Sequence, residues 1–336
     1  MAFTTVANGI VPRVFSPWLQ KLTEAKSRLV QSGAVQRDPM LDELLAGRGL
    51  TLDIPIWNDL ANTAANVSTD AADSQATVQN IDSHQQIAVR LSRNQVWGSA
   101  DLVQALSGDD VMGRIAERIS PYWMRHLQAT VLATLSGVFK DNDDNDDGDY
   151  TVDISGSAYQ KGVTDFSADA FIDAAHTMGD SEEDLGIVLM HEKVYARAKK
   201  NNLIDFVQDS QNPAAQRIPT FLGRQVLVDD GMPESSNVFE TFILGAGAIR
   251  IGSGQPRVPL ATDREELEAD GGGREYIISR VEWAVHPDGH AYTGTAPNGG
   301  PGNGTGSNHL DNAGSWDRRV SERKQVKIAR LITREA

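Results

Sequence analysis

The chain has 336 residues, and acidic side chains outnumber basic ones by 46 to 31, giving a formal net charge of −15. The absence of cysteine excludes disulfide scaffolds, thiolate metal sites and cysteine nucleophiles. The length predicts one elaborated domain or two modest ones, and 40% hydrophobic residues are enough for a packed core. The sequence has neither an apolar run long enough to span a membrane nor a secretion signal, so we expect a soluble, intracellular protein.

The charge is unevenly distributed along the chain. Residues 1–37 carry a net +4 and residues 317–336 again carry +4, so residues 38–316 carry −23. A body this acidic repels nucleic acid at long range, so favourable contact with phosphate is open only to the two basic ends. The favoured interpretation is that both ends are solvated amphipathic segments, with phosphate contact as the alternative.

Two segments with alternating apolar residues predict a long hairpin. Apolar residues occupy every second position in residues 50–56 and again in residues 87–93, which is the period of a strand with one buried face. The connector, residues 57–86, is rich in small polar residues and has four aspartates but no Lys or Arg. Because loops this long are uncommon in compact domains, we expect an arm that projects from the body; a plain surface loop is the alternative.

A long helix is predicted after this hairpin. Asp109 and Asp110 suit a helix start, where acidic side chains meet the positive end of the helix dipole. Apolar residues then recur at steps of four over about 30 residues, or roughly 45 Å of helix. Pro121 lies inside this stripe and predicts a kink or a break. We expect the helix to lie across a sheet as a brace. The stripe consists of Val111, Ile115, Ile119, Trp123, Leu127, Val131 and Leu135.

The acidic segment 141–149 is a candidate cation site. Asp143, Asn145, Asp147 and Gly148 match positions 1, 3, 5 and 6 of a calcium-binding loop. Ile154 occupies position 12, where a bidentate Glu belongs. The favoured interpretation is therefore a solvated acidic surface loop, with weak binding of a divalent ion as the alternative.

His286 and His290 form a second candidate metal site. With Asp288 they place two imidazoles and a carboxylate within five residues. The intervening proline and glycine exclude a helical presentation, and no third protein ligand is suggested nearby. We favour a strand that ends in a turn.

The rest of the chain is predicted to be mixed α/β. Helical patterns cover residues 168–178 and 192–203, and strand patterns cover residues 187–190, 224–228, 238–244, 274–285 and 325–333. Residues 294–315 contain seven glycines and no Lys or Arg. Such a segment is expected to form a mobile loop that cannot build a core.

Enzyme motifs are absent from the sequence. There is no phosphate-binding loop, no dinucleotide-binding glycine pattern and no nucleophile elbow. His191-Glu192 is followed by Tyr195 where a zinc protease would have its second histidine. We therefore assign no catalytic, cofactor-binding or metal-binding residue and expect that the protein is not an enzyme.

Three segments resemble one family. Residues 218–233, residues 274–289 and the C-terminal run from Trp316 to Ile332 are similar in order and spacing to tailed-bacteriophage major capsid proteins, a resemblance that covers roughly residues 48–336. It implies an α+β fold with five parts: an N-terminal arm (1–47), an extended loop (48–98), a spine helix with peripheral domain (99–164), an axial domain (165–265) and a return to the peripheral domain with a C-terminal strand (266–336). The spine helix itself is expected at residues 109–139.

The resemblance also implies a function. Pentamers and hexamers of the chain would tile an icosahedral shell around a double-stranded DNA genome, so the protein would reside in the virion after assembly in the bacterial cytoplasm. The expected partners are further copies of the chain, a separate scaffolding protein, a portal protein, packaged DNA bound without sequence specificity, and a possible decoration protein; no membrane is involved. Some members of the family are crosslinked through a lysine on the extended loop. Residues 48–139 contain no lysine, so we expect no such crosslink.

Three alternatives remain at this point. An encapsulin-type compartment shares the implied fold but would have a shorter extended loop. A calcium-dependent secreted enzyme would use residues 141–149. The missing signal sequence and the missing position-12 ligand argue against it. An acidic cytosolic binding protein would explain the composition but not the hairpin and the long helix.

Overall fold

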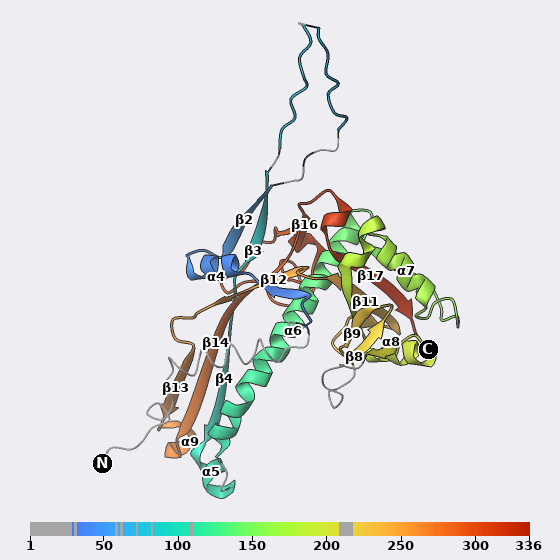
Figure 1. The fold of residues 1–336 in the computed structure, drawn as a ribbon. Coiled ribbons are helices and arrows are strands. Elements are labelled where there is room, and N and C mark those ends of the chain that lie inside the picture. The colour runs from blue at the N-terminus through green and yellow to red at the C-terminus, as the bar shows by residue number, and fades with distance from the viewer. Residues whose placement is uncertain are drawn as a thin grey trace.

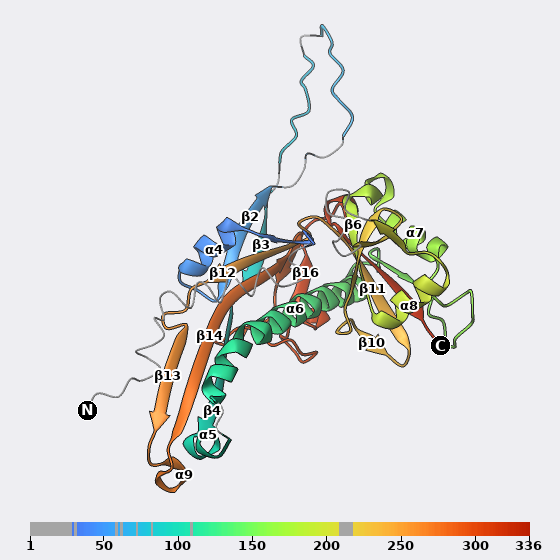
Figure 2. The ribbon, with the colours of Figure 1, turned by 60° about the horizontal axis from the view of Figure 1, so that its bottom comes forward.

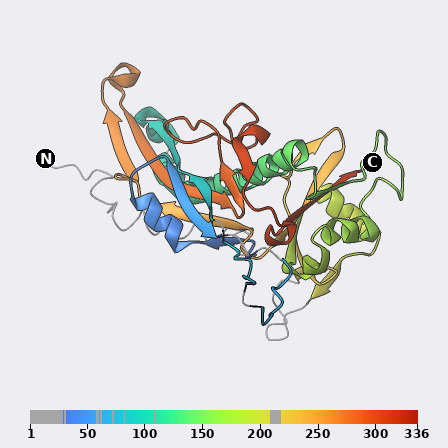
Figure 3. The same cartoon turned by 90° about the horizontal axis from the view of Figure 1, so that it is seen from above.

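Two lobes joined by one long helix make up the molecule, and a narrow hairpin projects from it (Figure 1). The computed structural model describes residues 29, 32–57, 60, 63–71, 73–81, 83–107, 110–207 and 218–336. Most of the expected N-terminal arm, residues 1–28, lies outside this part of the chain. Seen from above, the two lobes lie at opposite ends with the long helix between them (Figure 3).

The long helix, α6 (Val111–Asn145), follows the predicted apolar stripe. The Asp110 carboxylate accepts a hydrogen bond from the Gly113 backbone N–H at 2.9 Å and so caps the helix. The stripe is buried from Ile119 to Leu135. The helix continues through Pro121 without a break, and its axis changes direction along its length (Figure 2). Neither α6 nor any other described helix is apolar enough over sufficient length to cross a membrane.

One lobe is built on a five-stranded sheet. Its centre is β14 (Arg274–Pro287), which pairs along ten residues with β4 (Leu91–Ala100). On the opposite edge of β14 lie β12 (Ile249–Gly254) and β13 (Leu260–Glu265), and β1 (Val35–Arg37) pairs with β12. Helix α6 crosses this sheet as predicted: the Trp123 Nε1–H donates to the Ser279 hydroxyl at 3.0 Å, and the Trp123 and Trp283 rings meet edge to face.

The other lobe is built on an eight-stranded sheet. Its order is β5 (Thr151–Asp153), β17 (Ile328–Arg334), β11 (Val238–Gly245), β6 (Leu185–Met190), β9 (Arg224–Val228), β8 (Ile218–Phe221) and β7 (Asp205–Val207), with β10 (Glu234–Ser235) paired to β11. Helices α7 (Ala168–His176) and α8 (Glu192–Lys200) lie beside it, and α8 ends three residues before the predicted position. A separate apolar cluster that includes Phe166, Phe171 and Phe221 fills this lobe.

The predicted hairpin is confirmed as β2 (Thr51–Trp57) paired with β3 (Ser83–Val89). The strand expected at residues 87–93 is the junction between β3 and β4, which belong to different sheets. The apolar face of the base is covered within the chain. Leu52 and Ile54 pack with Leu41 and Leu45 of α4 (Pro39–Ala46). A neighbouring copy is therefore not needed to bury this part of the hairpin.

The expected domain boundaries do not coincide with the two sheets. Strands β12 and β13, expected in the 165–265 unit, belong to the five-stranded sheet with β14. Strand β17, expected to return to the other unit, lies inside the eight-stranded sheet between β5 and β11. The physical reason is that the chain crosses between lobes repeatedly, and strand pairing, which sequence order does not reveal, decides membership.

The prediction that residues 294–315 cannot contribute to a core is wrong. Leu310 is fully buried in the main apolar cluster, and the Tyr292 hydroxyl donates to the Asn308 carbonyl at 2.7 Å. The segment lies on α6, where Gly137 leaves room for it: a Cβ there would meet the Leu310 carbonyl oxygen and the Trp316 indole nitrogen. Its glycines allow the backbone to pack closely against the helix, in addition to giving the loop conformational freedom.

Candidate functional site

The projecting arm carries the largest group of exposed side chains without an intramolecular partner surface. Between β2 and β3, residues 63–71 run outward and residues 73–81 return beside them, both as extended segments without strand pairing (Figure 1). The Asn66 amide donates to the Thr77 carbonyl at 3.0 Å and accepts from the Thr77 N–H at 3.2 Å, which bridges the two segments. Apolar side chains on this arm face solvent, with Val67 91% and Val78 90% exposed. Exposed apolar groups on a thin arm are suited to burial against another surface.

The root of the arm is fixed to the five-stranded sheet by buried polar contacts. The Gln86 side-chain oxygen lies 2.8 Å from Nε2 of His286, and both side chains are inaccessible to solvent. Arg90, between β3 and β4, donates to the Leu45 and Gly47 carbonyls at 2.7 and 2.8 Å. These contacts hold the hairpin base against α4 and β14, so the direction of the arm is set by the lobe below it.

His286 and His290 do not form the candidate metal site. The imidazole of His286 faces Gln86, whereas His290 lies beside the Tyr150 ring and its Nδ1 is 3.0 Å from the Asp288 carbonyl. The Asp288 carboxylate pairs instead with Arg250 at 2.6 Å. Burial lowers the pKa of His286 to about 3 and that of His290 to about 4, because the protonated imidazole would lose its hydration. The strand β14 ends here in a turn, as expected.

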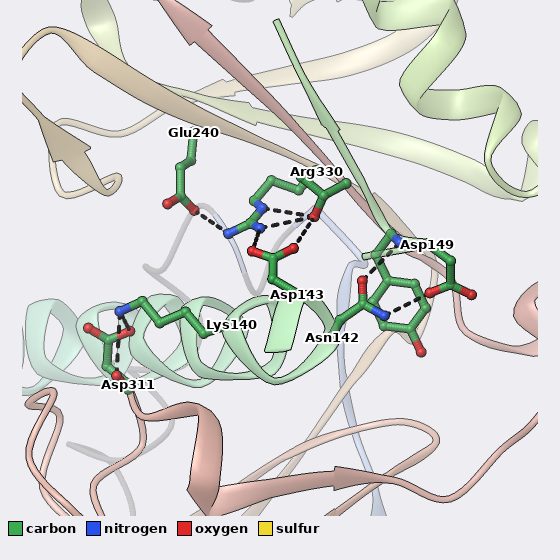
Figure 4. A network of polar contacts seen from close by, with 9 residues as sticks. Lys140, Asn142, Asp143, Asp149, Glu240, Asp311 and Arg330 are labelled. Atoms are coloured by element: carbon green, nitrogen blue, oxygen red, sulfur yellow. Dashed lines mark hydrogen bonds and ion pairs between the residues drawn. The ribbon is translucent and has the colours of Figure 1, made fainter. Parts of the chain in front are cut away.

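The C-terminal end of α6 carries a buried network of polar contacts (Figure 4). Arg330 on β17 is only 2% exposed and pairs with Asp143 on α6 and with Glu240 on β11 at 3.4 Å. Its guanidinium also bonds the Thr151 hydroxyl at 3.0 Å and stacks 5.0 Å from the Phe139 ring. Burial raises the pKa of Glu240, while the charge of Arg330 opposes that rise. One arginine thus joins the helix to two strands of the eight-stranded sheet.

The prediction of an acidic surface loop at residues 141–149 is wrong for its first half. Helix α6 continues to Asn145, and Asp141 and Asn142 are buried. The Asn142 side chain bonds the Tyr150 N–H at 3.0 Å and the Asp149 carboxylate at 2.7 Å, contacts that close the following turn (Figure 4). Desolvation raises the pKa of Asp141 to about 6. A helix that runs through the first positions of a calcium loop cannot wrap it around an ion.

Within the described residues, no cluster of three or more His, Asp or Glu side chains is arranged to hold a metal ion. A surface hollow of about 630 Å³ lies between α6 and the β10–β11 turn. Leu132, Ala133 and Pro233 line it together with Arg125 and Glu240.

The basic C-terminal end is used inside the molecule. Arg318 pairs with Asp149, Lys324 with Asp180, and Lys327 with Asp184, and Arg330 is buried as described. Phosphate contact by this end stays a prediction, because Lys324 and Lys327 remain 47% and 41% exposed in these ion pairs. Sequence order hid the pairing, since Asp149, Asp180 and Asp184 lie more than a hundred residues from their basic partners. The basic N-terminal end lies outside the described residues.

A second exposed apolar group lies at the far end of the five-stranded-sheet lobe. Helices α5 (Asp101–Ser107) and α9 (Glu268–Gly271) sit side by side there (Figures 1 and 2). Leu102 is 62%, Leu106 80% and Leu267 93% exposed. The molecule therefore presents exposed apolar side chains at both extremities, the arm and this end.

Comparison with known proteins identifies the architecture. The chain is 37% identical over 343 residues to the major capsid protein of Bacillus phage SPP1, and the match covers 98% of each sequence. No protein-family profile matches it.

Solved structures give the same answer at the level of the fold. The capsid of Ralstonia phage GP4 superposes with a TM-score of 0.62 at 10% identity, covering 93% of this chain and 92% of that one. Mycobacterium phage Adephagia gives a TM-score of 0.53 at 12% identity, with coverage of 90% and 89%. The two-lobed α+β architecture with its arm and long helix is thus a tailed-phage capsid fold, and the chain belongs to the family of phage major capsid proteins.

Proposed function

We propose that the chain assembles as pentamers and hexamers into an icosahedral shell around double-stranded DNA. The observation that carries this proposal is the arm of residues 63–81, whose apolar side chains extend beyond any surface of their own chain. Family membership supports it, because a major capsid protein builds its shell from many copies of itself. The role is structural, with no reaction assigned to the chain.

The arm is the extended loop that lies on a neighbouring subunit. Burying Val67, Val78 and Trp57 would each contribute about 1.5–3 kcal/mol, since these side chains are almost fully or largely exposed in the single chain. The base of the hairpin needs no such partner, because α4 already covers it. The contact with the neighbour is therefore confined to the outer part of the arm.

The two sheets supply the two domains of the shell subunit. We assign the lobe with the five-stranded sheet and α6 to the peripheral domain, and the lobe with the eight-stranded sheet to the axial domain around the capsomer centre. Supporting partners would be a separate scaffolding protein, a portal protein and a possible decoration protein. Assembly would take place in the bacterial cytoplasm and the product would be part of the virion.

The test compares shell formation by matched variants. The purified chain, alone and with a co-expressed scaffold, is analysed by sedimentation and negative-stain microscopy. V67S/V78S removes two apolar groups from the arm, and V163S removes one that is 62% exposed elsewhere. We expect closed shells from the wild type and from V163S, and unassembled subunits with unchanged circular dichroism from V67S/V78S. A chain that stays monomeric under every condition would refute the shell, and full assembly of V67S/V78S would refute the role of the arm.

A further inference from the structure

Two arginines, Arg118 and Arg125, lie on the exposed side of α6. Arg118 and Arg125 are both exposed, and neither forms a hydrogen bond or an ion pair with any residue that the structure describes. The arginines of the C-terminal segment, by contrast, are held by carboxylates or carbonyl groups. An acidic protein that pairs most of its arginines leaves these two available.

The geometry of the helix places them in a row. A rotation of about 100° per residue puts Arg125 within about 20° of Arg118 around the axis, and the seven intervening steps separate them by about 10.5 Å along it. Arg114 is exposed on the same face, about 40° from Arg118 by the same reasoning. We name Arg118 and Arg125 the arginine row.

Along α6 itself the charge beside this row is positive, although Asp229, Glu234 and Glu240 from the other lobe line the hollow next to Arg125. From Val111 to Phe139, Glu117 is the single carboxylate against three arginines. At physiological salt, charges more than about 8 Å apart are largely screened from each other. The distant acidic residues of the body therefore reduce the attraction of these arginines for an anion less than the net charge suggests. A guanidinium presents five N–H donors in a planar fork, which matches the oxygens of a phosphate.

We propose that the arginine row is a contact surface for the phosphate backbone of the enclosed DNA. This inference rests on the proposed function and adds which face of the subunit lines the interior of the shell. DNA carries a charge every 1.7 Å or so along its axis, so guanidinium groups about 10 Å apart can each contact a separate phosphate without sequence preference. The contact is thus made by the long helix in the middle of the chain.

The acidic arm of a neighbouring copy is a weaker partner for this surface. Its described connector offers Asp70 and Asp73, but its exposed Val67 and Val78 require an apolar surface to be buried. A face that presents Arg118 and Arg125 would leave those side chains in contact with charge. A linear polyanion, in contrast, presents phosphates along the full length of the row.

The test measures the reaction of arginine side chains with phenylglyoxal in intact particles. Particles filled with DNA are compared with the same particles after release of their DNA, and modified residues are quantified by mass spectrometry. Arg257, which is exposed and distant in sequence from α6, is the internal control. We expect Arg118 and Arg125 to react several-fold more slowly in filled than in emptied particles, with no change at Arg257.

The other outcomes overturn the proposal. If Arg118 and Arg125 react slowly in filled and emptied particles alike, another subunit covers the row. If they react as fast as Arg257 in both kinds of particle, nothing covers it. Protection found only in precursor particles that contain scaffold would assign the surface to the scaffold. A chain that forms no particles at all would instead refute the proposed function, so the two failures can be told apart.

Discussion

Replacement of Arg330 by methionine tests whether one buried arginine joins the long helix to the eight-stranded sheet. The substitution keeps an unbranched apolar stem, although a shorter one, and removes the charge and the five donors. Glu240, which is 19% exposed, would lose its partner, while Asp143, at 39% exposed, can turn toward water. The cost therefore comes mainly from Glu240.

The magnitude follows from the burial of these groups. Removing one partner of a buried ion pair costs about 3–5 kcal/mol, and the partial exposure of Asp143 favours the lower end, about 3 kcal/mol. For a cooperative unit of 150–250 residues, 1 kcal/mol shifts the melting temperature by about 2–4 °C. We therefore expect the melting temperature of R330M to fall by about 6–12 °C, measured by tryptophan fluorescence on the unassembled chain.

Second-site variants separate the lost ion pair from a general packing defect. E240Q in the R330M background removes the unpaired carboxylate and is expected to restore about half of the loss, because a neutral amide is less costly to bury. R257M, at an exposed position, is expected to melt like the wild type. By the same conversion, a shift of about 2 °C corresponds to about 1 kcal/mol. If R330M melts within that margin of the wild type, the Arg330 network does not stabilise the contact between α6 and the eight-stranded sheet.

Three further predictions concern the histidines, the packing of the glycine-rich segment and covalent linkage. His286 is buried with its pKa lowered to about 3, so its contribution to stability is complete above about pH 6.5 and is lost as the pH falls toward 3. H286Q should therefore reduce the slope of unfolding free energy against pH, between pH 6 and 4, by about 1.4 kcal/mol per pH unit; an unchanged slope would contradict the burial of a neutral imidazole. G137A should destabilise the chain to urea by about 1–2 kcal/mol despite the better helix propensity of alanine, because its methyl group meets Leu310 and Trp316; equal or greater stability would show that this segment does not pack on α6. Intact particles should run as single subunits on a denaturing gel, since residues 48–139 lack lysine, and a covalent ladder would refute that expectation.

Local pattern was sufficient for the elements whose periodicity is long or whose ends carry clear signals. The stripe from Ile119 to Leu135 and the capping residue Asp110 define α6, and the alternation around Leu52 and Ile54 defines the hairpin. The resemblance of ordered segments, rather than any single motif, indicated the family that a 37% identical relative then confirmed.

Contacts between distant segments could not be read from the sequence. Composition predicted a solvated loop at residues 141–149, yet tertiary partners hold Asp143 and Asn142 and let the helix continue. The same holds for Leu310, which a glycine-rich segment delivers to the core. In both cases the local preference is worth less than the burial and ion pairing that the fold supplies.

The sequence by itself determined the strongly periodic elements, the acidic body and the lack of cysteine and of loop lysine. Those properties depend only on residue type and spacing, which the chain fixes before it folds. The tertiary structure decided which strands share a sheet, which surface covers the base of the arm, and which of the basic residues remain free of an internal partner. Pairing of this kind depends on distances between residues far apart in the chain, and only the folded arrangement sets those distances.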